Sequence, residues 1–219
     1  FTVPDASAYR LNGSSYTIAA WFYKEVATGT GTLCVKRTSN GTADWEYVLY
    51  AHNSQVMQFL ISGNATSTST ISTGTTVVPA KTWTCAFAAY DSSGQTVATA
   101  LNNGSYEGSA STSGKTPTTN TANVSFGAVK NAAGETYANF FGGRIGVVAA
   151  FSSVLDSTER ALFYNNGYQL TYAQLPASLL AKVLWWAPFE STSGNETDAK
   201  TGSTITALNS PTYRCGAYK

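Results

Sequence analysis

Hydrophobic side chains in this sequence alternate with small or polar ones over short segments, and this two-residue period recurs along most of the chain. A period of two places successive side chains on opposite faces of a β-strand, so each segment predicts a strand with one face in a core. Turn-forming residues such as Asn53-Ser54 and Asn103-Gly104 separate the segments. The predicted strands are residues 15–23, 32–36, 45–51, 56–62, 82–90, 96–101, 123–129 and 143–151.

Helical spacing of apolar residues occurs late in the chain, at residues 155–164. Asp156 or Ser157 is placed to cap this helix, and Asn165-Asn-Gly167 is placed to end it. A second short helical piece is predicted at residues 176–181. Repeated short strands, one late helix and no alternation of strands with helices predict an all-β fold, an antiparallel β-sandwich.

Composition agrees with one domain of this kind and excludes some functions. A chain of 219 residues, 43% of them hydrophobic, is long enough for a single all-β domain with a large core. Residues 108–122 are mostly Gly, Ser, Thr and Pro and are predicted as an exposed loop. The net charge is +1 with 11% charged residues, so no basic patch for nucleic acid is expected. No run reaches eighteen apolar residues, so we expect no insertion into a membrane.

Several segments occur in an order known from one family. Tyr16-Thr-Ile-Ala-Ala-Trp-Phe22 is similar to a strand of the pattern F-T-I-x-A-W-F/V, and residues 79–91 to one of the pattern W-x-x-V-A-x-x-Y-D. Residues 141–146 and 155–165 are similar to the last strand and helix of the same fold. Together they resemble the laminin-G-like jelly roll, a concanavalin-A-like lectin fold, which implies a jelly-roll body over residues 1–182.

The order of the segments is permuted relative to that family. Residues 180–202 resemble the strand and loop that open the family's fold, although they stand at the end of this chain. Read head to tail, residues 213–219 run into residues 1–5, which resemble the segment that the family places after its opening strand and loop. Residues 183–219 are therefore expected to form a C-terminal strand segment that completes either the same sandwich, as in a circular permutant, or that of a neighbouring subunit.

Glu190 and Asp198 match two acidic residues of a loop in the family's pattern. The acidic residue that usually follows the family's G-x-I strand is replaced by Gly146 in this sequence. The resemblance implies that Asp198 and loop carbonyls are the one place for calcium, because a hard cation prefers oxygen ligands. The alternative is that Asp198 caps a turn. No other cofactor is expected.

Catalytic residues are scarce. Glycan-cleaving enzymes on this fold place two carboxylates on one strand, and no Glu-x-Asp-x-x-Glu cluster occurs here. Asp44 and Glu46, beside Trp45, are the candidate pair, with a solvated strand end as the alternative. His52 is the only histidine, so a multi-histidine zinc site is excluded, and no Gly-x-Ser-x-Gly motif exists. The sequence therefore predicts a protein that is not an enzyme.

Aromatic side chains offer a surface for sugars, which stack on exposed rings and form hydrogen bonds with Asn, Asp and Gln. Trp21 and Trp83 lie on apolar strands and are expected in the core. Trp45 is expected to be the exposed ring, with Asp44 beside it. These two residues are the first candidate ligand contacts.

The pair Trp185-Trp186 supplies a further candidate. Neighbouring residues of a strand point to opposite faces, so at most one of the two is expected in the core of a sandwich. The other, Trp186, is expected to contact a ligand or to be covered by a partner chain.

Six Asn-x-Ser/Thr sequons occur, of which about half are expected by chance in a chain so rich in Ser and Thr. A sequon accepts a glycan only in a chain that enters a glycosylating compartment. With the low charge, the sequons favour an extracellular location or a cell or virion surface. The candidate glycosylation sites are Asn12, Asn40, Asn64, Asn103, Asn123 and Asn195.

The three cysteines, Cys34, Cys85 and Cys215, allow at most one internal disulfide with one thiol left over, or a link between chains. The alternative is that all three are small buried hydrophobic residues. Their spacing is too wide for a Cys-x-x-Cys metal site.

Three functions are compatible with these observations. The leading hypothesis is a non-enzymatic extracellular structural or surface protein whose partners are copies of itself, assembled head to tail by strand donation. The second is a carbohydrate-binding module with glycans as partners. The third is a glycoside hydrolase, which requires two carboxylates in a groove.

Overall fold

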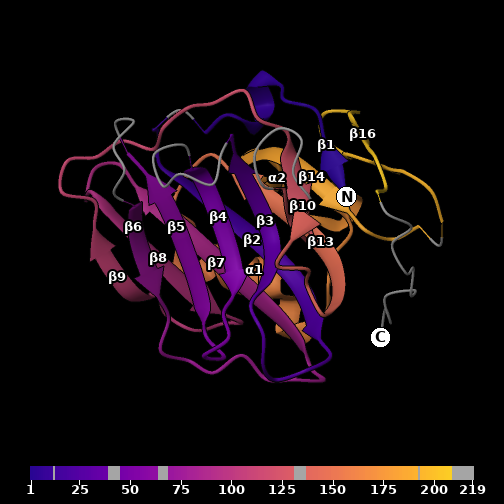
Figure 1. Cartoon of the computed structure of the whole chain (residues 1–219), viewed down its shortest axis with the longest axis horizontal. Coiled ribbons are helices and arrows are strands. Elements are labelled where there is room, and N and C mark those ends of the chain that lie inside the picture. Colours follow the sequence, from indigo (N-terminus) through magenta and orange to yellow (C-terminus); the bar gives the residue numbers. More distant parts are fainter. Residues whose placement is uncertain (12, 39–44, 64–68, 131–136, 192, 209–219) are drawn as a thin grey trace.

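Two six-stranded antiparallel sheets lie face to face and form a β-sandwich (Figure 1). The computed structural model describes residues 1–11, 13–38, 45–63, 69–130, 137–191 and 193–208. Sheet A contains, in spatial order, β1 (Thr2–Val3), β10 (Val124–Phe126), β3 (Gly31–Arg37), β4 (Trp45–Ala51), β5 (Met57–Ser62) and β6 (Ser69–Thr73). Sheet B contains β14 (Val183–Pro188), β13 (Gly143–Phe151), β2 (Tyr16–Lys24), β7 (Trp83–Asp91), β8 (Thr96–Leu101) and β9 (Glu107–Ser111).

Two short ribbons and several helical turns complete the described chain. The ribbons are β11 (Val129–Lys130) with β12 (Tyr137–Ala138), and β15 (Glu196–Thr197) with β16 (Thr204–Ile205). The helices are η1 (Ser7–Tyr9), α1 (Ser157–Tyr164), η3 (Asn165–Gly167), η4 (Tyr172–Gln174) and α2 (Ala177–Leu180). The fold class predicted from the two-residue period, an antiparallel sandwich with one short late helix, is confirmed.

The main core lies between the two sheets and is filled by alternate positions of the strands. Ile18, Ala20 and Phe22 of β2 point into it from sheet B, and Tyr47 and Leu49 of β4 point into it from sheet A. Burial of each large apolar side chain contributes about 1.5–3 kcal/mol, which makes this layer the main source of stability.

A second hydrophobic layer lies between sheet B and the helices. Trp21 of β2 points away from the main core into this layer, where Phe163 of α1 packs edge-on against Phe87 and Phe151 at 5.6 Å between ring centroids. Sheet B is therefore apolar on both faces, because the helices cover its outer face. In Figure 1, sheet A faces the viewer and α1 lies behind sheet B.

Helix α1 begins and ends where its sequence predicts. The Asp156 carboxylate accepts a hydrogen bond from the Glu159 N–H, and the Glu159 carboxylate accepts one from the Asp156 N–H, which forms a capping box. Asn165 ends the helix in the left-handed conformation with φ 46°. These local contacts set the length of the helix that covers sheet B.

Each predicted strand segment contains a strand, but two edges of the sandwich were not anticipated. The segment 123–129 is divided between β10 and β11 at Gly127, whose φ of 77° interrupts the extended backbone. The loop predicted for residues 108–122 is wrong at its start, because β9 extends through Ser111 and pairs with β8. β6 was also missed. Small polar residues form these edge strands, so the alternation that identifies a strand is weak there.

The C-terminal segment pairs with its own chain as far as Thr206. β14 lies antiparallel to β13, and Ala187 and Ile205 point into the main core. Thr2 and Thr206 bond to each other through both backbone N–H groups, at 3.0 and 2.7 Å. The first strand and the end of the described chain thus lie side by side.

Candidate functional site

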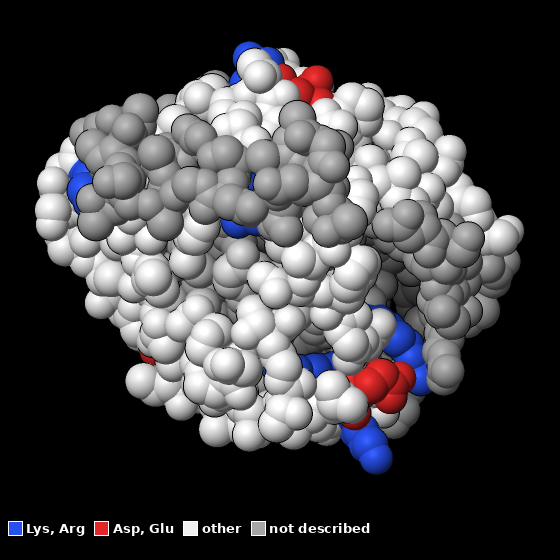
Figure 2. All heavy atoms as spheres, in the orientation of Figure 1, with Lys and Arg blue, Asp and Glu red and all other residues white. Residues whose placement is uncertain are grey.

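The outer face of sheet A carries a small hydrophobic cluster that none of the described helices covers. Val35, Val48 and Leu60 are buried in it, Tyr50 is 8% exposed, and Trp45 packs half-buried against its margin. On this side of the molecule the visible Lys, Arg, Asp and Glu atoms are few and lie mainly toward the rim (Figure 2). The described part of this face is thus mainly aromatic and apolar.

Trp45 and Arg37 are cross-strand partners at the start of β4. The register of β3 and β4 shifts between Lys36 and Arg37, so that Tyr47 lies opposite Lys36 and Trp45 lies opposite Arg37. The guanidinium carbon of Arg37 lies 5.8 Å from the centre of the Trp45 ring. Such a cation–π contact stabilises by about 0.5–1 kcal/mol at exposed sites. An indole face beside a guanidinium offers a sugar both a stacking surface and hydrogen-bond donors.

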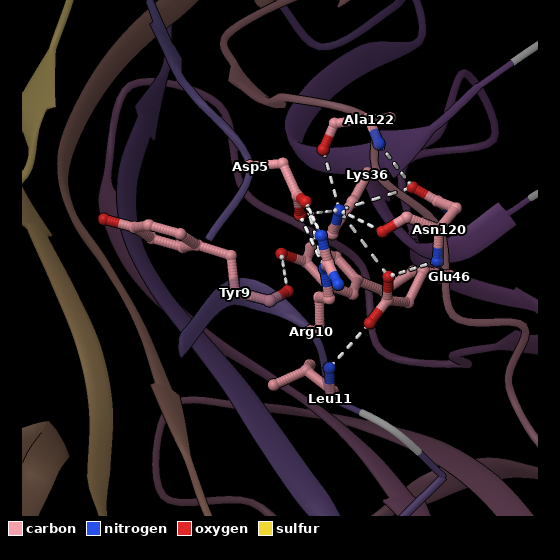
Figure 3. A network of polar contacts seen from close by, with 9 residues as sticks. Asp5, Tyr9, Arg10, Leu11, Lys36, Glu46, Asn120 and Ala122 are labelled. Carbon is pink, nitrogen blue, oxygen red and sulfur yellow. Dashed lines mark hydrogen bonds and ion pairs between the residues drawn. The ribbon is translucent and has the colours of Figure 1, made fainter. Parts of the chain in front are cut away.

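A buried polar cluster surrounds Lys36 of β3 and Glu46, the residue after Trp45 in β4 (Figure 3). The Lys36 ammonium group donates to the Ala122 carbonyl at 2.7 Å, the Asp5 carboxylate at 2.8 Å and the Asn120 carbonyl at 2.9 Å. The Asn120 side-chain oxygen lies 3.3 Å from it and the Glu46 carboxylate 3.7 Å. The side chains of Lys36 and Glu46 are both 0% exposed.

Backbone N–H groups hold the Glu46 carboxylate in this cluster. Its two oxygens accept hydrogen bonds from Leu11 N–H at 2.6 Å and Asn120 N–H at 3.2 Å. The Asp5 carboxylate is held in turn by the Arg10 guanidinium. Because Glu46 directly follows Trp45 in the chain, these bonds determine where β4 starts and where the indole stands.

The cluster shifts the protonation of its carboxyl groups in opposite directions. The pKa of Asp5 is lowered, chiefly by the hydrogen bond from Arg10, which stabilises the charged form. The pKa of Glu46 is raised, chiefly by burial, which penalises the charged form more than Lys36 and the backbone donors favour it.

Glu46 does not fit the role of a catalytic carboxylate in the candidate pair Asp44 and Glu46. Asp44 lies outside the described residues. Glu46 is buried with both oxygens bonded to the backbone, so the catalytic interpretation and the solvated strand end are both wrong for this residue. A carboxylate enclosed in this way cannot reach a glycosidic bond.

The Asp198 carboxylate caps a turn, which is the alternative to a cation site that the sequence left open. One oxygen accepts hydrogen bonds from the N–H groups of Trp186, Lys200 and Thr201, at 3.2, 2.8 and 2.9 Å. The other accepts one from the Tyr9 hydroxyl at 2.7 Å. The residue is 1% exposed, so protein donors occupy the positions that a cation would need. Within the described ranges, no three His, Cys, Asp or Glu residues are placed to hold a metal.

Trp185 and Trp186 are both buried, which corrects the expectation for this pair. Trp185 points into the main core, where Phe126 contacts it edge-on. Trp186 points the other way, into the layer under the helices, and packs on Phe163 and Tyr172 with centroids 5.9 Å away. At 1% exposure the Trp186 ring offers no face to a ligand, because sheet B is covered on both sides.

The remaining sequence candidates fall into two groups. Asn103, Asn123 and Asn195 are exposed, while Asn12, Asn40 and Asn64 lie outside the described residues; occupancy of all six sequons stays a prediction. Cys34 and Cys85 are free and buried, one in each large hydrophobic layer, which raises the pKa of both thiols. Cys215 is also outside the described residues.

A second half-exposed aromatic surface occurs at one end of sheet B. Trp21 is buried as expected, but Trp83 is half-buried, which corrects the expectation of a core residue. Tyr23 of β2 lies between its cross-strand partners Trp83 of β7 and Arg144 of β13. The ring centroids of Tyr23 and Trp83 are 5.8 Å apart, and the guanidinium carbon of Arg144 lies 4.9 Å from the Tyr23 centroid. Glu25 pairs with Arg144 at 3.2 Å, which partly neutralises this row.

Sequence reasoning missed Arg37, Lys36 and Asp5. A lysine inside the otherwise apolar segment 32–36 was a usable signal, because a buried ammonium requires carboxylate or carbonyl partners. No local pattern identifies those partners, which come from segments far apart in the chain.

The profile of the concanavalin A-like lectin/glucanase superfamily matches residues 1–159. A comparison with curated proteins finds no match. None of the helices in the described part of the chain has the length and hydrophobicity of a membrane span.

Solved structures with similar folds include carbohydrate-binding proteins. A putative carbohydrate binding protein from Bacteroides ovatus is 12% identical, with a TM-score of 0.65 over 97% of this chain, which spans 58% of that protein. The CBM40 of the Ruminococcus gnavus IT-sialidase is 15% identical, with a TM-score of 0.57 over 69% of this chain and 83% of that one. The SAP-like pentraxin of Limulus polyphemus is 14% identical, with a TM-score of 0.53 over 74% and 72%. At these identities the likeness concerns the fold. The profile match over most of the chain shows that the protein belongs to the concanavalin A-like lectin/glucanase superfamily.

Proposed function

We propose that this protein is a non-enzymatic carbohydrate-binding module whose sugar stacks on Trp45 at the outer face of sheet A. The observation that carries the proposal is a half-buried indole, flanked by a guanidinium, on a sheet face that the described helices leave uncovered. Tyr50 and Gln58 lie on the same face, the latter half-buried on β5, and add polar contacts of the kind that orient a sugar ring. Asp44, adjacent to Trp45 in the sequence, is proposed as a further contact.

Similar proteins support this assignment. One structure of the same fold is named a putative carbohydrate binding protein, and another contains the Ruminococcus gnavus CBM40 bound to α2,3-sialyllactose. The superfamily also includes glucanases, but the enclosure of Glu46 argues against hydrolysis by the Asp44–Glu46 pair.

The test is a glycan array followed by calorimetry with the best ligand. Saturable binding by the native chain, lost in Trp45→Ala and kept in Trp83→Ala, is the expected result. Trp83 is the matched control because it is also half-buried but lies on sheet B. Binding that survives Trp45→Ala and fails in Trp83→Ala moves the site to sheet B. A native chain that binds nothing on the array counts against the function itself.

Head-to-tail assembly by strand donation is the weaker candidate. β14 already pairs with β13, and Thr206 with Thr2, in the same chain, so the proposed donor strand has a partner without a second subunit. Light scattering at high protein concentration tests this candidate. A concentration-dependent polymer that dissociates when residues 183–219 are deleted is the result that restores it.

An extracellular or surface location remains part of the proposal. The exposed side chains of Asn103, Asn123 and Asn195 are sterically open to a glycosyltransferase. Mass spectrometry of the protein from its native source is the direct test, because an attached glycan at any of the three adds a defined mass.

A further inference from the structure

The Lys36 ammonium group stands in a cage of five oxygen atoms, here called the Lys36 cage (Figure 3). The cage atoms are Asp5 Oδ1, Glu46 Oε2, the backbone and side-chain oxygens of Asn120, and the Ala122 backbone oxygen. The Lys36 side chain is 0% exposed, so the cage is closed to solvent on the lysine side.

These oxygens are the types that hard cations take in proteins. Ca²⁺ binds carboxylates, amide oxygens, backbone carbonyls and water, about six to eight in all at about 2.3–2.6 Å. The cage supplies two carboxylates, one amide and two carbonyls, at 2.7 to 3.7 Å from the ammonium nitrogen. These distances are longer than those around Ca²⁺ because they are measured to an ammonium nitrogen. Modest inward shifts of the five oxygens, together with one or two water molecules, would complete the coordination of a metal ion.

The cage joins three segments that are distant in sequence. Asp5 comes from the N-terminal segment, Lys36 and Glu46 from neighbouring strands, and Asn120 with Ala122 from the segment before β10. A structural cation has this role in many proteins, since one ion neutralises and orients ligands from several loops at once. Here a covalently attached ammonium group has the same position and contacts.

We propose that the Lys36 cage is a cation site whose occupant in the native chain is the protein's own ammonium group, and that it accepts a free Ca²⁺ ion once that group is removed. It follows that the native protein holds this end of the sandwich, and the start of β4, without a dissociable metal. The inference is independent of the proposed sugar binding, because it concerns cation binding and stability alone.

The charges of the cage support an exchangeable cation. Two carboxylates, Asp5 and Glu46, are balanced by Lys36 inside and by Arg10 at the rim. Removing the ammonium leaves one buried negative charge without compensation, and a buried unpaired charge is strongly unfavourable. A small cation that enters the space of the lysine side chain restores the balance and the oxygen contacts.

The experiment compares thermal unfolding of the native chain, Lys36→Ala and Lys36→Met, each with EDTA and with added CaCl₂. Lys36→Ala opens the cage, whereas methionine fills the same space with a thioether that hard cations bind poorly. Lys182→Ala, which removes a lysine paired with Glu159 on the far side of the fold, is the matched control. Tetramethylammonium chloride at equal ionic strength controls for screening.

We expect Ca²⁺ at about a hundred times its Kd to raise the Tm of Lys36→Ala by about 5–10 °C. The native chain, Lys36→Met and Lys182→Ala are expected to show no change with either CaCl₂ or EDTA. Methylammonium chloride, which resembles the end of the missing side chain, is expected to give a smaller rise in Lys36→Ala alone.

The proposal is overturned if neither Ca²⁺ nor methylammonium stabilises Lys36→Ala, or if Ca²⁺ stabilises all four proteins equally. Should Lys36→Ala fail to fold without added ions, its refolding yield with and without Ca²⁺ gives the same decision. A native chain that binds no sugar leaves this result unaffected, so the two proposals fail separately.

Discussion

The outer faces of the two sheets carry aromatic residues of similar kind but differ in what covers them. Sheet B presents Trp21, Phe87 and Trp186 to the helices and buries them completely. On the outer face of sheet A, Val129 and Ala138 of the β11–β12 ribbon join the cluster in place of helices, so that Tyr50 is buried while Trp45 remains half-buried. The comparison teaches that an aromatic residue on an outer sheet face becomes core or candidate site according to its cover, because strand alternation alone treats both faces alike.

The largest expected effect comes from the covered face. Trp186→Ala removes a ring that contacts Phe163 and Tyr172, and we expect it to lower the free energy of unfolding by about 3–5 kcal/mol. Denaturant unfolding measures this loss. A stable Trp186→Ala variant that no longer binds sugar shows instead that the ring faces a ligand.

The uncovered face is expected to respond in affinity more than in stability. Trp45→Ala removes the proposed stacking ring and is expected to weaken sugar binding at least tenfold, as hot-spot aromatic residues do. Because the ring is half-buried, the free energy of unfolding is expected to fall by less than in Trp186→Ala. Calorimetry and denaturant unfolding on the same preparation separate the two effects. Equal losses of stability in both variants mean that the faces do not differ as proposed.

A smaller effect is expected from the guanidinium beside the indole. Arg37→Ala removes a contact of about 0.5–1 kcal/mol, so we expect sugar affinity to fall about two- to fivefold. Arg144→Ala, which removes the corresponding contact with Tyr23 on sheet B, is the control and is expected to leave affinity unchanged. Titration calorimetry with the array ligand measures both. A loss in Arg144→Ala alone places the ligand on sheet B.

The smallest expected effect is a change in how the free energy of unfolding depends on pH. It concerns sheet A, because charged groups hold the end of that sheet whereas apolar contacts hold the outer face of sheet B. The lowered pKa of Asp5 adds stability above its ordinary value of 3.8, and this part is lost as the pH falls through the lower folded value. Asp5→Asn is therefore expected to lose less stability than the native chain below about pH 3.8. Unfolding curves from about pH 2 to about pH 7 measure the difference.

Glu46→Gln is the control, because the pKa of Glu46 is shifted in the opposite direction to that of Asp5. The raised pKa of Glu46 favours the folded state below 4.5, and this contribution is lost as the pH rises through the higher folded value. Glu46→Gln is expected to remove that decline above about pH 4.5. If both variants follow the pH profile of the native chain, the cluster does not govern its acid response.

Much of the fold was predictable from local patterns. The strand positions follow from alternation, as in the match between residues 45–51 and β4. The helix α1 follows from its spacing, with Asp156 and Asn165 at its ends. The edge strands β6 and β9 did not follow, because Ser, Thr and Gly there give no apolar alternation.

The candidate site was predictable only in part. Trp45 was predicted to be an exposed ring and is half-buried. Trp186 was misassigned because a sandwich strand was expected to have one face in solvent. Helix α1 and the turn containing Tyr172 remove that wet face, and nothing in the local sequence of β14 records their position. For Asp198 the sequence allowed either a cation or a turn cap, and only the structure shows the four donors that bond to its carboxylate.

The sequence by itself determined the helix α1 and most of the strands, and hence the sandwich, because backbone geometry translates spacing along the chain into faces of an element. Only the tertiary structure decided what each face meets. Lys36 contacts Asp5, Glu46 and Asn120 because segments up to 84 residues apart pack together, and the helices described after β13 pack on the outer face of sheet B. Burial, pKa and access to a ligand depend on those distant neighbours, so the site emerges only once the chain is folded.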